Sequence, residues 1–158
     1  MAEAIFAAGC FWGVEQAFRD TSGVLETTVG YIGGNSKDPT YEEVCTGQTG
    51  HAEAVKVRYD PMEISFEGLL NVFWSCHNPT QVDRQGPDVG TQYRSAIFCV
   101  DEAQRATAEK SKLALQSAGE LKAPIATKIV AADHFYMAED YHQQYFEKRG
   151  QRPHFLGP

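Results

Sequence analysis

Segments with the period of a β-strand and segments with the period of an α-helix follow one another along this chain without a regular βαβ repeat. Residues 54–59 alternate apolar and polar side chains after the first residue, as half-buried strands do. Phe11, Val14 and Phe18 instead recur at helical spacing. Strands and helices mixed in this irregular order pack as layers around one core. We therefore expect an α+β two-layer sandwich with a mixed sheet, a ferredoxin-like plait with irregular loops.

Local signals predict the remaining elements. The expected strands are residues 4–8, 24–32, 54–59, 95–100 and 128–132. The expected helices open near residues 10, 40, 65 and 101, and a last one lies near 139–148. Thr40 and Glu43 have the signature of a capping box, and a second box is expected at Asp101 with Gln104. Residues 80–91 are polar and contain glycine and proline, so they are predicted to form a long, functional loop.

The composition limits the classes of function. With 158 residues, 42% of them hydrophobic, the chain has the size of a single domain, expected to span residues 1–158. Its formal net charge of −7 repels phosphate backbones and anionic lipid, so we expect neither nucleic acid nor membrane as a partner. No stretch approaches the roughly 20 apolar residues of a membrane span, and the N-terminus lacks a signal sequence. The expected protein is a cytoplasmic monomer.

The four cysteines are widely spread, at positions 10, 45, 76 and 99. A domain of this size needs no disulfides, so we interpret them as reduced thiols. Cys10 lies where a strand passes into a helix, and unpaired amides with the positive end of the helix dipole favour a thiolate there. This predicts a nucleophile with a lowered pKa, although a small buried apolar role is the alternative. The adjacent Phe11 and Trp12 form either core or the wall of an apolar pocket.

Several short motifs occur in a fixed order. They are Gly9-Cys10-Phe11-Trp12-Gly13-Val14-Glu15, Gly30-Tyr31 leading to Gly33-Gly34, Tyr41-Glu42-Glu43-Val44-Cys45-Thr46-Gly47, Gly50-His51-Ala52-Glu53-Ala54-Val55 and Asp88-Val89-Gly90-Thr91-Gln92-Tyr93-Arg94-Ser95. This set resembles the peptide methionine sulfoxide reductases of the A type, from about residue 5 to residue 142. The resemblance implies an enzyme that reduces methionine-S-sulfoxide, in oxidised proteins and as the free amino acid, with thiols as the reductant. One departure is Asn78, where the family usually has aspartate, which puts a local loop contact in doubt.

Carried over position by position, the resemblance assigns roles to the site residues. It makes Cys10 the nucleophile, Phe11 and Trp12 the wall of a methyl pocket, Glu53 the acid near the sulfoxide oxygen, and Tyr41, Asp88 and Tyr93 the rest of the polar side. The chemistry explains this set, because a thiolate that attacks a sulfoxide sulfur pushes negative charge onto an oxygen that leaves only when protonated. Glu53 serves only as the neutral acid, so burial has to raise its pKa toward neutrality.

The attack leaves a sulfenic acid on Cys10 that another thiol has to reduce. Family members commonly use cysteines in a C-terminal tail, but residues 151–158 contain none. The simplest hypothesis is a one-cysteine cycle in which thioredoxin, glutaredoxin or glutathione reduces Cys10 directly, with no bound cofactor. Structural roles are favoured for Cys45, Cys76 and Cys99, and Cys76 is the least improbable resolving cysteine among them.

Plainer interpretations stay open at this point. Without the motifs, the alternatives are a solvated carboxylate at Glu53, a residue of a first helical turn at Tyr41, a turn at Asp88 and a strand aromatic at Tyr93. Other functions are a metal site, a thiol hydrolase that pairs Cys10 with His51, and a non-catalytic binder of oxidised methionine. No Cys-x-x-Cys or paired-histidine spacing occurs, so no metal is expected.

Overall fold

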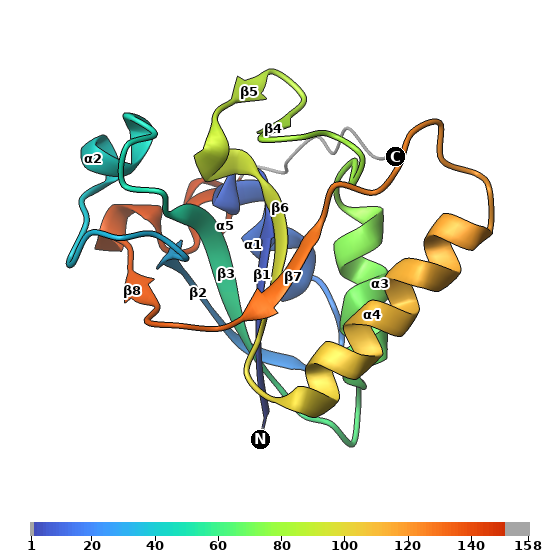
Figure 1. Cartoon of the computed structure of the whole chain (residues 1–158). Helices are drawn as coiled ribbons and strands as arrows, with labels where there is room; N and C mark the ends of the chain where they lie inside the picture. Colours follow the sequence, from blue (N-terminus) through green and yellow to red (C-terminus); the bar gives the residue numbers. More distant parts are fainter. Residues whose placement is uncertain (1, 151–158) are drawn as a thin grey trace.

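The computed structural model describes residues 2–150, so the predictions for the tail at 151–158 concern residues outside this range. A six-stranded sheet in the order β7-β6-β1-β3-β2-β8 forms its centre (Figure 1). The strands are β1 (Ala2–Ala8), β2 (Val24–Ile32), β3 (Ala52–Tyr59), β6 (Ser95–Cys99), β7 (Lys128–Ala131) and β8 (Tyr136–Met137). The short strands β4 (Arg84–Gln85) and β5 (Asp88–Val89) pair with each other apart from this sheet.

The four central strands have the topology of a ferredoxin-like plait. In the order β6-β1-β3-β2 every neighbouring pair is antiparallel. Helix α1 (Phe11–Arg19) connects β1 to β2, and helix α3 (Phe66–Ser75) lies between β3 and β6 along the chain, which completes the βαββαβ pattern. Strand β7 adds to β6 in parallel, so the sheet is mixed. The predicted fold class is confirmed.

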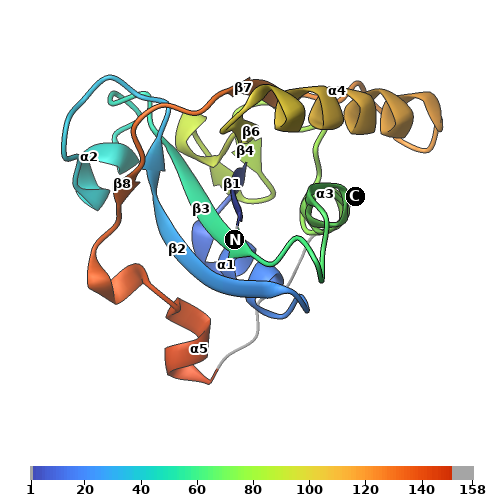
Figure 2. The ribbon, with the colours of Figure 1, turned by 90° about the horizontal axis from the view of Figure 1, so that it is seen from below.

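Helices α1 and α3 pack against one face of the sheet (Figure 2). The aromatic side chains of that face are buried between the helices and the sheet. The Phe6 ring of β1 lies 4.9 Å from the Phe18 ring of α1 and 5.4 Å from the Phe73 ring of α3, measured between ring centroids. The predicted helical face of Phe11, Val14 and Phe18 is buried. In the part of the chain that the structure describes, no helix has the length and apolarity required to cross a lipid bilayer.

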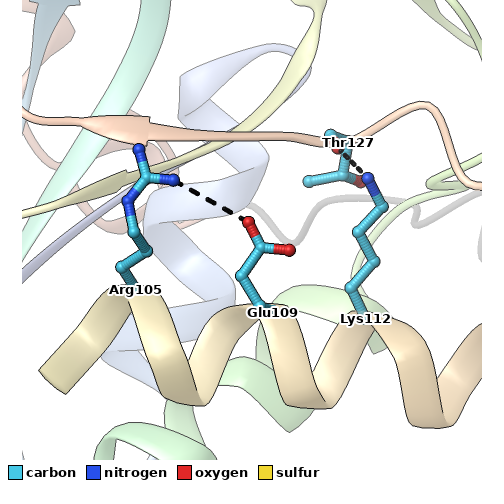
Figure 3. Close-up of polar contacts among 4 residues, drawn as sticks. All are labelled: Arg105, Glu109, Lys112 and Thr127. Carbon is cyan, nitrogen blue, oxygen red and sulfur yellow. Dashed lines mark hydrogen bonds and ion pairs between the residues drawn. The ribbon is translucent and has the colours of Figure 1, made fainter. Parts of the chain in front are cut away.

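Helix α4 (Glu102–Ser117) packs beside α3 and is tied to its surroundings by polar contacts. The Trp74 indole donates a hydrogen bond to Ser111 Oγ over 2.9 Å. The next residue of α4 is Lys112, whose Nζ atom donates to the carbonyl oxygen of Thr127 at 2.9 Å, just before β7 (Figure 3). The ion pair of Arg105 with Glu109, also drawn in Figure 3, is solvent-exposed and contributes little.

Of the two predicted capping boxes, the one at Thr40 is complete, and the one at Asp101 has one of its two hydrogen bonds. At the start of α2 (Tyr41–Cys45), Thr40 and Glu43 make both hydrogen bonds of the capping box. At the start of α4, Asp101 accepts from the Gln104 amide as predicted. The Gln104 side chain, however, accepts from the amide of Val100, one residue before the cap. Its amide group also donates to the Glu3 carbonyl on β1, so it joins the helix start to the sheet.

Two predicted segments differ from the structure. The expected loop at 80–91 contains the β4-β5 hairpin and leads into the 3-10 helix η1 (Thr91–Tyr93). The expected helix at 139–148 is wrong, because this segment forms the 3-10 helix η2 (Asp140–His142) and a separate helix α5 (Tyr145–Arg149). The helical conformation is interrupted between them at Gln144, which has a positive φ of 54°. The Gln144 amide donates to Glu15 Oε1 at 2.7 Å, a contact between distant residues that local periodicity does not reveal.

Gly9 connects β1 to α1 in a backbone conformation that suits glycine. Its φ is +100°, and a Cβ placed there would lie 2.8 Å from Cβ of Gln85 in β4. Gln85 in turn accepts from the Asn78 amide and donates to the Asn78 carbonyl, both at 2.9 Å. The junction before Cys10 therefore depends on close approach of the β4 loop to a residue without a side chain.

Replacing Gly9 by Ala is expected to lower the free energy of unfolding by roughly 2–6 kcal/mol, because strained φ and overpacking each cost about 1–3 kcal/mol. Gly119→Ala is a matched control, since Gly119 has φ +73° but open space around it. It should lose only the backbone part, on the order of 1 kcal/mol. Urea denaturation of both variants measures the difference; equal losses would show that Gln85 yields at no cost.

Candidate active site

Cys10 is the N-cap of α1 and lies directly after β1 and Gly9. The backbone amides of Trp12 and Gly13, in the first turn of the helix, act to lower the pKa of its thiol. This is the predicted placement at a strand-to-helix junction. The side chain is partly exposed, so a reagent can approach the sulfur from one side.

The predicted lowering of the Cys10 pKa is wrong for the free site. Burial raises the pKa of the thiol to about 12, and the negative charges of Glu53 and Asp88 add to the effect. The two amides act in the opposite direction but are outweighed. The partial charges of a helix N-terminus stabilise a thiolate. Here the free-energy cost of removing the thiolate from water exceeds that stabilisation. The resting site therefore holds Cys10 as the neutral thiol.

Glu53 is a buried carboxyl group next to this thiol. It lies on β3 with 1% of its surface exposed, which excludes the alternative of a solvated carboxylate. The Phe11 amide, one residue after Cys10, donates to its Oε1 atom at 3.2 Å, and its Oε2 atom is buried without a partner in residues 2–150. Burial raises the Glu53 pKa to about 8, against the Phe11 hydrogen bond and with a further contribution from Asp88. A carboxyl group with this pKa keeps its proton at neutral pH, as the expected role of an acid requires, and that role stays a prediction.

Three other predicted residues reach the same region from separate segments. Asp88 lies in β5, and its charge raises the pKa values of Glu53, Cys10 and Tyr93. Tyr93 ends η1, and burial followed by the Glu53 charge raises its pKa, so the phenol keeps its proton. Tyr41 opens α2, and its pKa is raised by burial, with a smaller contribution from Glu53. The structure thus gathers these side chains around one carboxyl group, as the motifs predict.

The two aromatic residues after Cys10 differ in their packing. Phe11 is buried against Tyr31 and His142, with ring centroids 5.7 and 5.2 Å away. Trp12 is partly exposed and stacks on Tyr145 at 3.7 Å with an interplanar angle of 6°. Its indole nitrogen donates to His142 Nδ1 at 2.9 Å. The Trp12 ring is therefore held by two contacts with the C-terminal segment.

His142 and Tyr145 support this site but are not among the residues expected from the sequence, because the expected helix at 139–148 is continuous. His142 is fully buried, and its ring centroid lies 4.4 Å from that of Tyr41. Burial lowers the His142 pKa, so the ring is neutral. Because Nδ1 accepts from the indole, the ring proton is on Nε2, which has no partner within the described residues. The aromatic pairs at 141–142 and 145–146 are the only signal in the sequence, and they resemble core residues.

Glu139 connects this segment to the polar side of the site. Its Oε1 atom accepts from the Tyr31 hydroxyl at 2.9 Å, and its Oε2 atom accepts from the Tyr41 amide at 2.9 Å. The carboxylate thus satisfies a free amide in the first turn of α2 and fixes the start of that helix against β2. Tyr41 is positioned by this contact.

The hydrolase alternative is contradicted by the position of His51. Its Nδ1 atom accepts from the Gly34 amide at 3.0 Å, and its Nε2 atom lies 2.8 Å from the Ser36 carbonyl oxygen. Both ring nitrogens are used by the loop at 33–36, so His51 cannot serve as a base for Cys10. Residues 2–150 contain no group of three or more His, Cys, Asp or Glu side chains arranged to hold a metal ion.

Asn78, where the family usually has aspartate, still makes the local loop contact with Thr80. Asn78 Oδ1 accepts from the backbone amide of Thr80 at 3.0 Å and from its hydroxyl at 2.6 Å. Both bonds need only an acceptor oxygen, which asparagine and aspartate share. The loop that approaches Gly9 is therefore held as an aspartate would hold it.

Comparison with known proteins identifies relatives of one kind. The family model described as "Peptide methionine sulfoxide reductase" matches residues 2–155. A peptide methionine sulfoxide reductase MsrA of Methanosarcina acetivorans is 61% identical over 148 residues, which cover 94% of this chain and 79% of the relative. The crystal structure of Mxr1 from Saccharomyces cerevisiae in reduced form superimposes with a TM-score of 0.90 at 36% identity, over 98% of this chain and 89% of that one. Mxr1 in complex with Trx2 gives 0.64 at 26% identity, over 91% and 84%.

The buried Glu53 should make stability depend on pH. The folded state keeps the proton up to a pKa of about 8, whereas the unfolded carboxyl loses it near 4.5. Between these values the folded state holds a proton that the unfolded state has lost, so stability falls as pH rises, by up to about 1.4 kcal/mol per pH unit. We expect the free energy of unfolding to fall by roughly 2–4 kcal/mol more in the parent protein than in Glu53→Gln between pH 5 and 8.

Urea denaturation at several pH values measures this difference. Gln keeps an oxygen that accepts from the Phe11 amide, so the variant removes the titration and preserves that contact. Glu26→Gln, at an exposed carboxylate of β2, is the control and should leave the slope of the parent protein unchanged. Parallel slopes for Glu53→Gln and the parent protein would contradict a buried, protonated Glu53.

Proposed function

Because this chain belongs to the peptide methionine sulfoxide reductase family, it is a thiol-dependent methionine sulfoxide reductase, and we propose that Cys10 attacks the sulfoxide with Glu53 as the proton donor. The observation that carries this assignment is the pair itself: a partly exposed thiol at a helix N-terminus and a buried acid joined to that helix by the Phe11 amide. The preferred substrate is the S epimer, a preference that follows from the resemblance to the A type.

The reaction transfers oxygen from one sulfur to another. The Cys10 sulfur attacks the sulfoxide sulfur, the sulfur–oxygen bond of the substrate breaks, and the oxygen ends on Cys10 as a sulfenic acid. The substrate sulfur is reduced by two electrons to the thioether, and the Cys10 sulfur is oxidised by two. The proton of the thiol ends on the transferred oxygen, so the step needs no other reactant.

Glu53 links the two proton movements of this step. Its pKa of about 8 keeps it protonated near neutral pH, and the unpartnered Oε2 atom is free to meet the sulfoxide oxygen. While Glu53 is neutral, its charge no longer opposes ionisation of Cys10. A proton given to the sulfoxide oxygen makes the substrate sulfur more electrophilic. The same neutral acid therefore favours both the nucleophile and the leaving oxygen.

The remaining site residues position the substrate. Trp12, held by Tyr145 and His142, and the neighbouring Phe11 form the apolar side that receives the methyl group. The phenols of Tyr41 and Tyr93 keep their protons and are donors to the sulfoxide oxygen, and a water held by Asp88 shares that role. These donors support the charge that develops on oxygen.

An external thiol returns the enzyme to its reduced form. The relative Mxr1 forms a complex with Trx2, which supports a thioredoxin-type dithiol as the partner here rather than glutaredoxin or glutathione. All four cysteines are free thiols, in keeping with a reducing compartment such as the cytoplasm. Substrates are oxidised proteins and free methionine sulfoxide. The monomeric state stays a prediction, which gel filtration would test.

Replacing Cys10 by Ser should abolish methionine formation, because a hydroxyl is not ionised or nucleophilic enough to attack the sulfoxide. The assay mixes reduced enzyme with each epimer separately and measures methionine by chromatography. Only the S epimer should react with the parent protein. Cys99→Ala, which removes a buried thiol of β6, is the control and should keep its activity. Unchanged activity in Cys10→Ser would exclude the mechanism and favour a binding module.

Replacing Glu53 by Gln should slow methionine release in a single turnover on the order of a hundredfold, as expected for loss of a general acid. Rapid mixing followed by acid quench measures this rate without interference from the reductant. Asp88→Asn should have a smaller effect, because Asp88 contributes charge and a held water rather than the transferred proton. Near-normal rates in Glu53→Gln would shift the donor to Tyr41 or Tyr93.

A further inference from the structure

Arg149 adds a third layer to the aromatic contact of Trp12. It is the last residue of α5 and stands four residues after Tyr145, so the two side chains share one face of this helix. Its guanidinium carbon lies 3.6 Å from the centroid of the Tyr145 ring, and its Nη1 atom donates to the Tyr145 carbonyl oxygen at 3.1 Å. The Trp12 indole covers one face of that ring, so the guanidinium covers the other. The three side chains form one stack.

The two rings of this stack lie almost face to face. Carbon atoms in contact are about 3.5–4.0 Å apart, so a centroid distance of 3.7 Å with an interplanar angle of 6° leaves little room for a lateral offset. Aromatic pairs prefer an offset or an edge-to-face arrangement, because the faces of both rings carry partial negative charge. The pair of Trp12 and Tyr145 therefore contains a repulsion that a nearby positive charge would reduce.

The guanidinium of Arg149 supplies this positive charge. A cation over an aromatic ring is attracted to the negative face, and the planar guanidinium of arginine stacks well on such a face. The charge draws electron density of the Tyr145 ring toward Arg149, which reduces the negative charge on the face that meets the indole. Arg149 thus stabilises Tyr145 directly and the contact of Tyr145 with Trp12 indirectly.

The same charge supports the second contact of the indole. The Trp12 indole nitrogen donates to His142 Nδ1 at 2.9 Å, which requires a neutral imidazole. Burial lowers the His142 pKa, and two acidic side chains, Glu139 and Glu42, oppose this effect. The positive charge of Arg149 acts in the same direction as burial. Arg149 therefore favours the form of His142 that accepts from the indole.

The backbone of α5 is anchored without Arg149. Gln16 Nε2 on α1 donates to Glu147 Oε2 on α5 at 3.1 Å. The Gln144 amide, directly before α5, donates to Glu15 Oε1 at 2.7 Å. Loss of the Arg149 side chain should therefore loosen the Tyr145 ring while α5 stays bound to α1.

We propose that Arg149 is a positioning residue for substrate binding, because it holds the Tyr145 ring against Trp12 and so fixes the indole that receives the methyl group of the sulfoxide. The proposal rests on the proposed function, in which Trp12 forms the apolar side of the site. It gives Arg149 no contact with the reacting sulfur or oxygen. The contribution of Arg149 is therefore to the affinity for the sulfoxide and not to the chemical step.

Single-turnover kinetics separate affinity from chemistry. Reduced protein is mixed with increasing concentrations of methionine-S-sulfoxide, and the rate of methionine formation gives a maximal rate and a half-saturating concentration. In Arg149→Ala the half-saturating concentration should rise about threefold to fivefold, the size of an exposed cation–π contact, while the maximal rate equals that of the parent protein. A lower maximal rate at an unchanged half-saturating concentration would overturn the proposal, as would two unchanged values.

Three further variants isolate the role of the guanidinium. Arg149→Met keeps an unbranched stem without the charge and should weaken binding as much as Arg149→Ala. Arg149→Lys keeps the charge without the planar group and should lie between Arg149→Ala and the parent protein. Lys148→Ala is the control, because it removes a neighbouring cation of α5 that bonds the Asp140 carbonyl oxygen, and it should bind substrate as the parent protein does. Binding like that of the parent protein in Arg149→Met, or equal losses in Lys148→Ala and Arg149→Ala, would contradict the proposal.

The fluorescence of Trp12 tests the stack without any turnover. Trp74→Phe removes the other tryptophan of the chain, so the indole emission of this variant comes from Trp12. Adding Arg149→Ala to it should increase quenching of that emission by acrylamide, because the indole loses cover from Tyr145. Unchanged quenching would overturn the proposal. No methionine from the parent protein would instead refute the proposed function, and the quenching would still show whether Arg149 holds the stack.

Discussion

The hydrogen bond from the Phe11 amide to Glu53 Oε1 is the contact on which the site depends. It joins the first turn of α1 to the central strand β3, and it binds the carboxyl group to the residue that directly follows the thiol. An amide at a helix N-terminus has no partner within the helix, so the carboxyl satisfies a group that would otherwise be buried and unpaired. One oxygen is occupied by this bond, and the other has no partner within the described residues.

Burial decides the protonation of the whole site. It is the largest cause of the raised pKa values of Cys10, Glu53 and the two tyrosines, and it outweighs the helix amides at the sulfur. At neutral pH the free site therefore contains neutral donors and a neutral nucleophile. A carboxyl group with a pKa of about 8 and a thiol with one of about 12 are poorly matched until a sulfoxide oxygen takes the proton from the acid. The substrate therefore takes part in the proton transfer, which links ionisation of the thiol to the presence of a sulfoxide.

Those parts of the fold that the sequence predicts are the parts with local causes. The capping box at Thr40, the helical spacing after Cys10 and the alternation in β3 each arise from neighbours within a few residues, and each is present in the structure. The burial of Glu53 has no local signal in the sequence and is expected only from the chemistry that the resemblance implies. The predictions that are wrong have distant causes. The thiol pKa depends on burial and then on charges from β3 and β5, and the interruption at Gln144 depends on Glu15. No periodicity within 139–148 reports a hydrogen bond that originates in α1.

Helix α1 combines these distant effects in a single element. Glu15 accepts from the Gln144 amide at 2.7 Å and from the Thr27 hydroxyl at 2.8 Å, so the helix that bears the nucleophile also anchors the segment that supports Trp12. Tyr145 follows Gln144 directly and stacks on the indole. A shift of α1 therefore moves the thiol, the indole and the support of the indole together, and their spacing is kept. This explains why the motif at 9–15 is specific as a unit, since its residues have separate physical tasks. Gly9 makes the strained junction, Cys10 is the N-cap of the helix, and the Phe11 amide binds the acid. Trp12 stacks on Tyr145, Val14 fills the core, and Glu15 holds the C-terminal segment.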